Sequence, residues 1–404
     1  MKKFSLYIAM VGLPARGKST ISARLKDNLM DDSIKTRIFN NGDLRRRMIP
    51  SNTSFSEFYN PENKAGAAVR ENIAHINMDN AKNFLEKGGN VAIIDATNVS
   101  SPRRSVIQKR LNDHPILFIE CINNDEEVLD ASIKRKTETA EFENLSREAA
   151  FHSFKERIAY YISIYTPLKT EKNFLKLDTL YNRIIKEEVG ESIPFYDRIR
   201  DFLVTDTIKN LFVIRHGETY FNLENRIGGD SELTEKGKQQ ARDMAIYFEK
   251  KEIPLIFTSQ KKRTIQGAEI IKESQKDCSI VPLEEFNEID SGLCECMSYE
   301  EIRRDMPHVY NARKMDKYNY IYPEGEGYVT MKNRIDRGIK KALFLSNSSK
   351  NIMIIGHRAA NRMILSHFLF RREEDVPYIY IPQDRFYYVS VTKNKKLFQL
   401  KKYN

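Results

Sequence analysis

A glycine-rich segment near the beginning of the chain has the residues that hold a phosphate group. Gly-Leu-Pro-Ala-Arg-Gly-Lys-Ser, residues 12–19, stands between an apolar run and a helical pattern, which is the setting of a P-loop. Glycines let backbone N–H groups wrap around an anion, and the N-terminus of the helix adds partial positive charge. Lys18 would reach the outer phosphates of a nucleotide, and Ser19 would bind magnesium. The alternative interpretation is an ordinary turn.

A carboxylate further along the first half supports the P-loop interpretation. Asp95 closes a short apolar run, at the point where a parallel sheet presents its ligand-facing ends. It could hold magnesium through water or polarise an attacking hydroxyl, although such a residue is also typical of a turn or helix cap. Two or three basic residues would have to converge to bind a phosphorylated acceptor, because each alone is an ordinary surface residue. The candidates are Arg45, Arg46, Arg70, Arg103, Lys136 and Arg157.

Two histidines follow apolar runs in the second half of the chain. His216 ends the segment Leu-Phe-Val-Ile-Arg-His, and His357 ends the segment Ile-Met-Ile-Ile-Gly-His. A third apolar run ends at Thr258-Ser259, with Arg263 one helical turn beyond. Three strands that end in polar residues predict a single site at one edge of an open sheet.

The residues around these histidines indicate a phosphate site and not a metal site. Arg215 adjoins His216, and such a cation would repel a metal ion but attract an anion. A neutral imidazole nitrogen can attack phosphorus and form a phosphohistidine, while arginines offset charge on the phosphoryl oxygens. The departing alcohol needs a proton, for which Glu288 is a candidate donor. Satisfied structural histidines are the alternative.

The elements that must position these residues alternate between strands and helices. Apolar runs predict strands at residues 5–11, 91–94 and 116–119, and again at 211–214, 255–257 and 352–355. A helix is predicted after the P-loop, where apolar residues recur every four positions. Runs of this kind predict parallel strands covered on both faces. The fold class is therefore α/β with two domains, 1–207 and 208–404, each a mainly parallel sheet covered by helices. The junction, 170–207, is charged and weakly periodic.

The composition narrows the class of protein. The 404 residues are 41% hydrophobic and 30% charged, which suits two or three compact domains. No apolar run approaches the roughly 18 residues of a membrane helix. Four scattered cysteines form neither a disulfide framework nor a zinc site, which favours a reducing, cytoplasmic location. The net charge of +10 is spread over both halves, so it is weak evidence for nucleic acid binding. Anionic small molecules held by arginines would produce the same excess.

The order of the motifs resembles one enzyme family. The first half carries the P-loop, Phe-Asn-Asn-Gly-Asp-Leu-Arg-Arg at 39–46, Asp-Ala-Thr-Asn at 95–98 and Arg-Ile-Ala-Tyr-Tyr at 157–161. The second half carries Arg-His-Gly-Glu at 215–218, Arg-Ile-Gly-Gly-Asp-Ser at 226–231 and Asn-Glu-Ile-Asp at 287–290. Nearly the whole chain is thus similar to the bifunctional 6-phosphofructo-2-kinase/fructose-2,6-bisphosphatase family. This resemblance implies a P-loop nucleoside-kinase-like domain followed by a histidine-phosphatase domain of the phosphoglycerate-mutase type.

In the first domain, the resemblance implies that ATP and Mg²⁺ bind and that fructose 6-phosphate accepts the phosphoryl group. Lys18 and Asp95 would be catalytic, and Ser19 and Asp95 would hold the metal. The nucleotide would contact Gly12, Leu13, Pro14, Ala15, Arg16, Gly17, Lys18, Ser19 and Thr20. The sugar phosphate would contact Arg45, Arg70, Thr97, Arg103, Lys136, Arg157 and Tyr161.

In the second domain, the resemblance implies hydrolysis of fructose 2,6-bisphosphate. His216 would carry the phosphoryl group, with Glu288 as the acid, His357 beside it, and Arg215 and Arg263 around it. The substrate would also contact Asn222, Gly228, Tyr299, Arg313, Lys317, Tyr328, Arg358 and Arg362. Arg358 stands where the family usually has glutamine, so a fixed charge replaces a neutral amide.

The remaining expectations concern the binding partners of the protein and its alternative functions. The resemblance implies a cytoplasmic homodimer that binds neither nucleic acid nor a membrane. One rival is a polynucleotide kinase/phosphatase, because such P-loop kinases can share the Asp-x-Thr-Asn signature. That rival would use an aspartate nucleophile, whereas this chain offers Arg-His-Gly. The other rivals are a family member with one active half and an interaction protein with two inactive domains.

Overall fold

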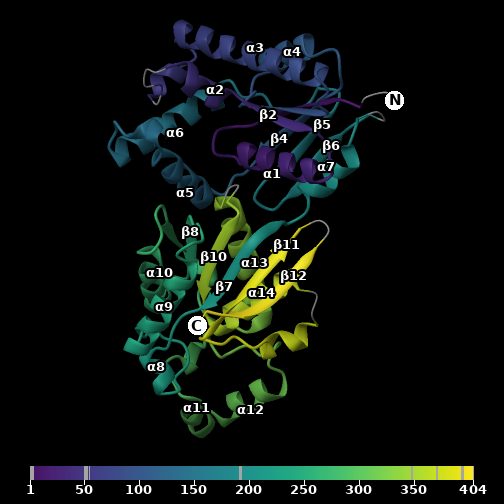
Figure 1. Ribbon diagram of the computed structural model, residues 1–404. Helices are drawn as coiled ribbons and strands as arrows, with labels where there is room; N and C mark the ends of the chain where they lie inside the picture. The colour runs from purple at the N-terminus through teal and green to yellow at the C-terminus, as the bar shows by residue number, and fades with distance from the viewer. Residues whose placement is uncertain are drawn as a thin grey trace. The chain divides into compact units, whose positions relative to one another are not determined.

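The computed structural model describes residues 4–49, 53, 55–190, 193–346, 349–369, 372–392 and 395–403. The chain divides into two compact units, Met1–Thr205 and Asp206–Asn404, whereas the sequence predicted the boundary at residue 207. In each unit, helices lie on both faces of a central sheet (Figure 1). Among the described residues, no helix combines the length and the apolar character needed to cross a bilayer.

Unit 1 alternates strands with helices along most of its length. Its strands are β1 (Leu6–Val11), β2 (Thr36–Asn40), β3 (Val91–Asp95), β4 (Ile116–Ile122), β5 (Phe174–Asp178) and β6 (Arg183–Glu188). Its α-helices are α1 (Lys18–Asp31), α2 (Asn41–Met48), α3 (Lys64–Glu86), α4 (Ser101–Arg110), α5 (Glu126–Thr137), α6 (Arg147–Ser163) and α7 (Tyr196–Leu203). Short 3₁₀ turns cover Ser56–Tyr59 and Ala140–Phe142.

The sheet of unit 1 has the order β2-β3-β1-β4-β5-β6 and is parallel except for β6. Because successive strand residues point to opposite faces, β1 contributes to two cores. Leu6, Ile8 and Met10 pack with α1 and α7, whereas Tyr7 and Ala9 pack with α3 and α4. Every residue of β1 is buried, which is typical of a central parallel strand. This sheet therefore holds the P-loop and Asp95 on adjacent, rigid strands.

A smaller apolar cluster lies beside the P-loop. Ala15 of the loop packs with Ile133 of α5 and with Phe154 of α6. This contact fixes α5 and α6 against the loop, so basic residues on these helices can face the phosphate site.

Unit 2 also has a central six-stranded sheet covered by helices, but its strands follow a different order. Its strands are β7 (Ile208–Arg215), β8 (Leu255–Thr258), β9 (Ser279–Pro282), β10 (Asn351–Gly356), β11 (Arg385–Val391) and β12 (Lys396–Lys402). Its α-helices are α8 (Tyr220–Leu223), α9 (Glu235–Phe248), α10 (Lys262–Lys272), α11 (Tyr299–Asp305), α12 (Pro307–Met315), α13 (Tyr328–Leu345) and α14 (Arg358–Phe368). Short 3₁₀ turns cover Glu284–Phe286, Gly292–Cys294 and Glu373–Tyr378.

The sheet of unit 2 has the order β12-β11-β7-β10-β8-β9. Strands β7, β10, β8 and β9 are parallel, and β11 and β12 are antiparallel additions at one edge. Helices α9 and α10 cover one face, and α13 and α14 lie on the other (Figure 1). Helices α11 and α12 form a separate cluster with Cys294 and Tyr322. The ends of β7, β10 and β8 therefore meet at one sheet edge.

The six strands predicted from apolar runs are confirmed, with bounds shifted by a few residues. The runs did not predict β2, β5, β6, β9, β11 or β12. The junction in particular, read as weakly periodic, contains β5, β6 and α7. Strand β6 escaped detection because it is an edge strand with mostly exposed side chains, so it shows no apolar run.

Candidate active sites

The P-loop of unit 1 is shaped to wrap an anion. Gly12 has φ of 136°, and a Cβ there would lie 2.5 Å from the Cys121 carbonyl oxygen, so only glycine fits. Gly17, at the N-cap of α1, is left-handed and offers no side-chain cap to the helix. The first amides of α1 are therefore available to a ligand, and the helix dipole favours negative charge there.

Lys18 lies beneath this loop. Its ammonium group donates a 2.6 Å hydrogen bond to the Leu13 carbonyl, and only 8% of the residue is exposed. Burial lowers the pKa of Lys18 to about 8, while Cys121 and Asp95 oppose the shift. An anion beside Lys18 would favour the charged ammonium.

Asp95 ends β3 and is 3% exposed. Burial raises its pKa, whereas Ser19, Lys18 and Asn40 favour the charged carboxylate. Asn40 donates from Nδ2 to Asp95 and accepts at Oδ1 from the Asp43 amide, 3.0 Å away. Asn40 thus caps α2 and fixes the carboxylate with one amide group.

The oxygen atoms of Ser19 and Asp95 fit a magnesium ion. Ser19 hydrogen-bonds Asp95, so a hydroxyl and a carboxylate meet beside the P-loop. Hydroxyl, carboxylate and phosphate oxygens are the ligands that Mg²⁺ prefers. These two residues, together with nucleotide phosphates, are a suitable donor set.

Three guanidinium groups surround the ring of Tyr59. Arg157 stacks on the ring at 3.8 Å from its centroid, and Arg45 and Arg70 lie at 5.6 and 5.9 Å. Tyr161 also faces the ring, at 6.1 Å between centroids. Nε of Arg45, Nε of Arg157 and the Tyr59 hydroxyl are buried without a hydrogen-bond partner. Unpaired buried donors converging in one place indicate a site for an anionic ligand.

The other basic residues predicted in unit 1 border this cluster. Burial and the Arg157 charge lower the pKa of Lys136, and Asp95 opposes that shift, so Lys136 lies near both. Arg103 pairs with Glu71 at 2.7 Å, and its charge acts on Arg70. Thr97 contacts the P-loop through its backbone, because its carbonyl oxygen accepts a hydrogen bond from the Gly12 amide at 2.9 Å. Arg46 instead pairs with Asp43 and Glu141 at the surface.

In unit 2, the three predicted strand ends do meet. Arg215 pairs with Gly356 across β7 and β10, and Ile355 pairs with Thr258 across β10 and β8. His216 and His357 follow directly, with ring centroids 5.3 Å apart. The parallel register therefore places the two histidines side by side.

The hydrogen bonds of His216 determine which ring nitrogen is free. Nδ1 lies 2.7 Å from the Gly217 carbonyl oxygen, which can only accept, so Nδ1 carries the proton. Nε2 is then the unprotonated nitrogen. Burial, then Arg263 and Arg215, hold the pKa of His216 well below its usual value. His216 is a neutral imidazole suited to nucleophilic attack.

His357 is fully buried and contacts Arg263. Its Nδ1 accepts a 3.2 Å hydrogen bond from Nε of Arg263, and its Nε2 lies 2.8 Å from the Ser259 hydroxyl. The proton therefore sits on Nε2, which donates to Ser259. Arg263 also donates to the Gly229 carbonyl at 2.9 Å. In this arrangement His357 orients Arg263 beside His216.

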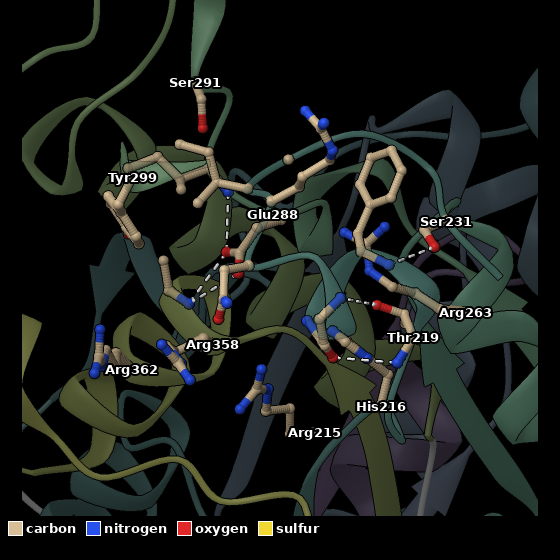
Figure 2. A pocket seen from close by; sticks show the side chains of 18 of the residues that line it. Arg215, His216, Thr219, Ser231, Arg263, Glu288, Ser291, Tyr299, Arg358 and Arg362 are labelled. Atoms are coloured by element: carbon tan, nitrogen blue, oxygen red, sulfur yellow. Dashed lines mark hydrogen bonds between the residues drawn. The ribbon is translucent and has the colours of Figure 1, made fainter. Parts of the chain in front are cut away.

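Glu288 occupies the N-terminus of α14. Its carboxylate accepts from the Ala359 and Ala360 amides, each at 3.1 Å, and from the Ile289 amide at 3.0 Å. Figure 2 shows this carboxylate facing into the pocket that His216 and Arg263 also line. The helix end therefore fixes the position of the predicted acid.

These residues border a cavity of about 430 Å³. It is strongly basic, because seven lysine and arginine residues line it against two glutamates. Burial and the charge of Arg358 lower the pKa of Arg215 to about 10, and burial with Arg362 and Arg313 lowers that of Lys317 to about 8. Arg215, Arg358 and Arg362 are seen in a row in Figure 2. Such crowding of cations indicates a ligand with more than one negative group.

The outer part of the cavity is held by aromatic residues. Arg313 lies over the Tyr299 ring at 5.3 Å and donates to its hydroxyl at 3.2 Å. Arg362 donates to the Tyr328 hydroxyl at 2.9 Å. Tyr299 begins α11 and Tyr328 begins α13, so both helices help to shape the opening of the cavity.

The structure gathers all the residues predicted for unit 2. Those that line the cavity are Arg215, His216, Asn222, Gly228, Arg263, Glu288, Tyr299, Arg313, Lys317, Tyr328, Arg358 and Arg362. His357 is the exception, because it lies behind Arg263. Sequence reasoning missed Tyr59 and Gln383, which have no motif. Asn40 stands inside a recognisable motif, so that signal was available.

Known proteins show the same two-part organisation. Residues 1–217 match the family model of 6-phosphofructo-2-kinase, and residues 211–404 match that of the histidine phosphatase superfamily (branch 1). The chain is 35% identical over 390 residues to 6-phosphofructo-2-kinase/fructose-2,6-bisphosphatase 4 of Rattus norvegicus, covering 93% of this chain and 80% of that one. It is 34% identical over 391 residues to the Homo sapiens enzyme numbered 3, covering 93% and 72%.

A third relative is similar to the chain over nearly the same length. The chain is 33% identical over 388 residues to 6-phosphofructo-2-kinase/fructose-2,6-bisphosphatase 1 of Mus musculus, covering 93% of this chain and 79% of that one. Both halves of the chain are thus matched in one continuous alignment. This chain belongs to the 6-phosphofructo-2-kinase/fructose-2,6-bisphosphatase family.

Proposed function

We propose that unit 1 makes fructose 2,6-bisphosphate from ATP and fructose 6-phosphate, and that unit 2 hydrolyses it. The family assignment supports both activities. The observation that carries the proposal is the free Nε2 of a neutral His216 at a cavity with seven cationic side chains. The histidine nucleophile also favours this function over the polynucleotide kinase/phosphatase alternative.

In unit 1, the 2-hydroxyl oxygen of the sugar would attack the γ-phosphorus of ATP, and the bond to the β-phosphate oxygen would break. Asp95 would accept the hydroxyl proton, because it is fixed by Asn40 at a strand end. Lys18 would leave the Leu13 carbonyl and bind phosphate oxygens. The three arginines around Tyr59, which are Arg45, Arg70 and Arg157, would hold the 6-phosphate of the sugar.

Magnesium would bind at Ser19 and Asp95 together with the nucleotide phosphates. When bound, it would neutralise charge on the phosphate oxygens. The amides at the start of α1 would share that role, since no side chain caps them.

In unit 2, Nε2 of His216 would attack the phosphorus at the 2-position, and the bond to the sugar oxygen would break. Glu288 would give that oxygen a proton, and a phosphohistidine would form. Water would then attack the phosphorus, the bond between the phosphorus and Nε2 of His216 would break, and Glu288 would take a proton from the water, which releases inorganic phosphate. Arg215 and Arg263 would stabilise the phosphoryl oxygens from positions fixed before the substrate binds.

The direct experiment follows a labelled phosphoryl group through both steps. The purified full chain is given γ-labelled ATP and fructose 6-phosphate and quenched in alkali, in which phosphohistidine survives. We expect label first in the sugar bisphosphate, then on His216, and finally in inorganic phosphate. His216→Ala should accumulate labelled bisphosphate and carry no label on the protein. Label on another residue, or equal loss of both activities in folded His216→Ala, would contradict the two-site proposal.

The homodimer implied by the resemblance stays a prediction. Sedimentation of the full chain at several concentrations tests it. A mass of one chain at every concentration would contradict it.

A further inference from the structure

Gln383 borders the unit 2 cavity from the segment that precedes β11. Its Nε2 donates to the His216 carbonyl oxygen at 3.2 Å and to Oδ1 of Asn222 at 3.0 Å. The backbone carbonyl of Gln383 accepts a hydrogen bond from the Tyr403 hydroxyl. The side chain therefore joins the backbone of the nucleophile to a second residue of the cavity.

The surroundings fix which end of each amide faces which partner. Oδ1 of Asn222 also accepts from the Thr219 backbone amide at 3.2 Å, so this atom must be the oxygen. The His216 carbonyl can only accept. Gln383 must then present its nitrogen to both, and both lone-pair directions of Asn222 Oδ1 are used.

In this arrangement the side-chain nitrogen of Asn222, Nδ2, is available to donate hydrogen bonds to a ligand. Asn222 lines the cavity, and its Nδ2 has no acceptor among the described residues. With Oδ1 held by Thr219 and Gln383, the donor end cannot exchange places with the acceptor end without breaking two hydrogen bonds. An amide turned the other way would present lone pairs to a negative phosphoryl oxygen.

Gln383 also completes the hydrogen bonds around His216. The His216 amide donates to the Gly356 carbonyl at 3.0 Å, and Nδ1 donates to the Gly217 carbonyl. The contact from Gln383 holds the remaining carbonyl. The ring and both peptide groups of His216 are therefore fixed before substrate enters.

We propose that Gln383 is a positioning residue for phosphoryl transfer to His216, acting by holding the Asn222 amide with its N–H groups toward the phosphoryl oxygens. The proposal rests on the proposed phosphohistidine chemistry of unit 2. It assigns Gln383 no contact with the substrate. We expect Gln383 to affect kcat and not substrate binding, because the charge on the phosphoryl oxygens in the transition state must be met by donors already in place.

The test compares Gln383→Leu with the wild-type chain. Leucine keeps the approximate shape but has no donor, so we expect kcat for fructose 2,6-bisphosphate to fall about 10-fold while KM changes less than about 3-fold. Gln399→Leu, at an exposed position of β12, is the matched control and should leave both constants unchanged. A kcat within about 2-fold of wild type would overturn the proposal.

A double-mutant cycle shows whether Gln383 acts through Asn222. We expect Gln383→Leu to reduce kcat much less in the Asn222→Ala background than in wild type, because only the contact of Gln383 with the His216 carbonyl is then left to lose. Fully additive losses would refute the mechanism. If Gln383→Leu fails to fold, as judged by circular dichroism, Gln383→Met takes its place in the same cycle.

A substrate without the sugar separates this proposal from the proposed function. p-Nitrophenyl phosphate reports transfer to His216 whatever the natural substrate is. If the wild-type chain hydrolyses p-nitrophenyl phosphate but not fructose 2,6-bisphosphate, the proposed function fails. The kcat of Gln383→Leu for p-nitrophenyl phosphate, compared with that of wild type, then still tests the role of Gln383. The same loss of kcat with both substrates supports the proposal, and a loss confined to the sugar bisphosphate contradicts it.

Discussion

Replacing Arg263 by alanine is the sharpest perturbation of the unit 2 site. Arg263 is 5% exposed and donates to Nδ1 of His357 at 3.2 Å and to the Gly229 carbonyl at 2.9 Å. After burial, its charge is the largest factor that lowers the pKa of His216. Arg263→Ala therefore removes a cation from the cavity and changes the titration of His216, the proposed nucleophile.

Two effects of different size follow. Loss of one preorganised donor from an oxyanion-type site costs about 2.7–4 kcal/mol, or roughly 10²–10³ in kcat. Separately, His216 must be neutral to attack, so activity falls as pH drops through its pKa. Removing the Arg263 cation lets that pKa rise, so the acid limb of kcat/KM moves to higher pH. Burial remains, so the pKa does not return fully to its ordinary value.

The assay is rapid-quench measurement of phosphohistidine formation from about pH 5 to about pH 8. Arg263→Lys is the control, because it keeps the charge but loses the bidentate geometry. We expect a smaller loss of rate for lysine and an acid limb close to that of wild type. A rate for Arg263→Ala within about 3-fold of wild type, or an unmoved acid limb, would refute this account of the site.

Three further predictions concern other parts of the chain. Lys18→Met should reduce kinase turnover by at least about 100-fold, measured as ADP release, while bisphosphate hydrolysis continues. Because the pKa of Lys317 is lowered to about 8, its charge is lost above that pH and KM for the bisphosphate should rise there; Lys317→Arg should abolish the rise in a pH series. Arg104 is 1% exposed and pairs with buried Glu171 at 2.5 Å. Arg104→Met leaves a buried charge unpaired, so urea titration should show a loss of about 3–5 kcal/mol in the stability of unit 1, and an unchanged midpoint would contradict the pairing.

The sequence predicted the central strands and the residues at their ends. Runs such as Val91 to Asp95 are readable because a strand buried on both faces needs apolar residues throughout its length. A functional residue placed just after such a run is then assigned to a sheet edge without knowledge of the fold. The edge strands β6 and β12 could not be read in this way, because each lies at the edge of its sheet and neither contains a fully buried residue.

Pairing across the sheet required the tertiary structure. The sequence predicted that His216 and His357 end strands, but only the β7–β10 register places their rings 5.3 Å apart. The protonated nitrogen of His357 is likewise set by Arg263 and Ser259, which are distant in the chain, whereas that of His216 is set by the adjacent Gly217. The distance between the rings and the tautomer of His357 therefore depend on contacts between segments that folding brings together.

The chemistry of this protein was thus carried by short motifs, since a phosphate loop and a strand-end histidine are local arrangements of the backbone. The tertiary structure alone decided how these groups are held. Tyr59 gathers three arginines, and Gln383 links His216 to Asn222. Neither residue belongs to a motif, because each acts on partners that are distant in the chain and meet it only when the sheets and helices have packed.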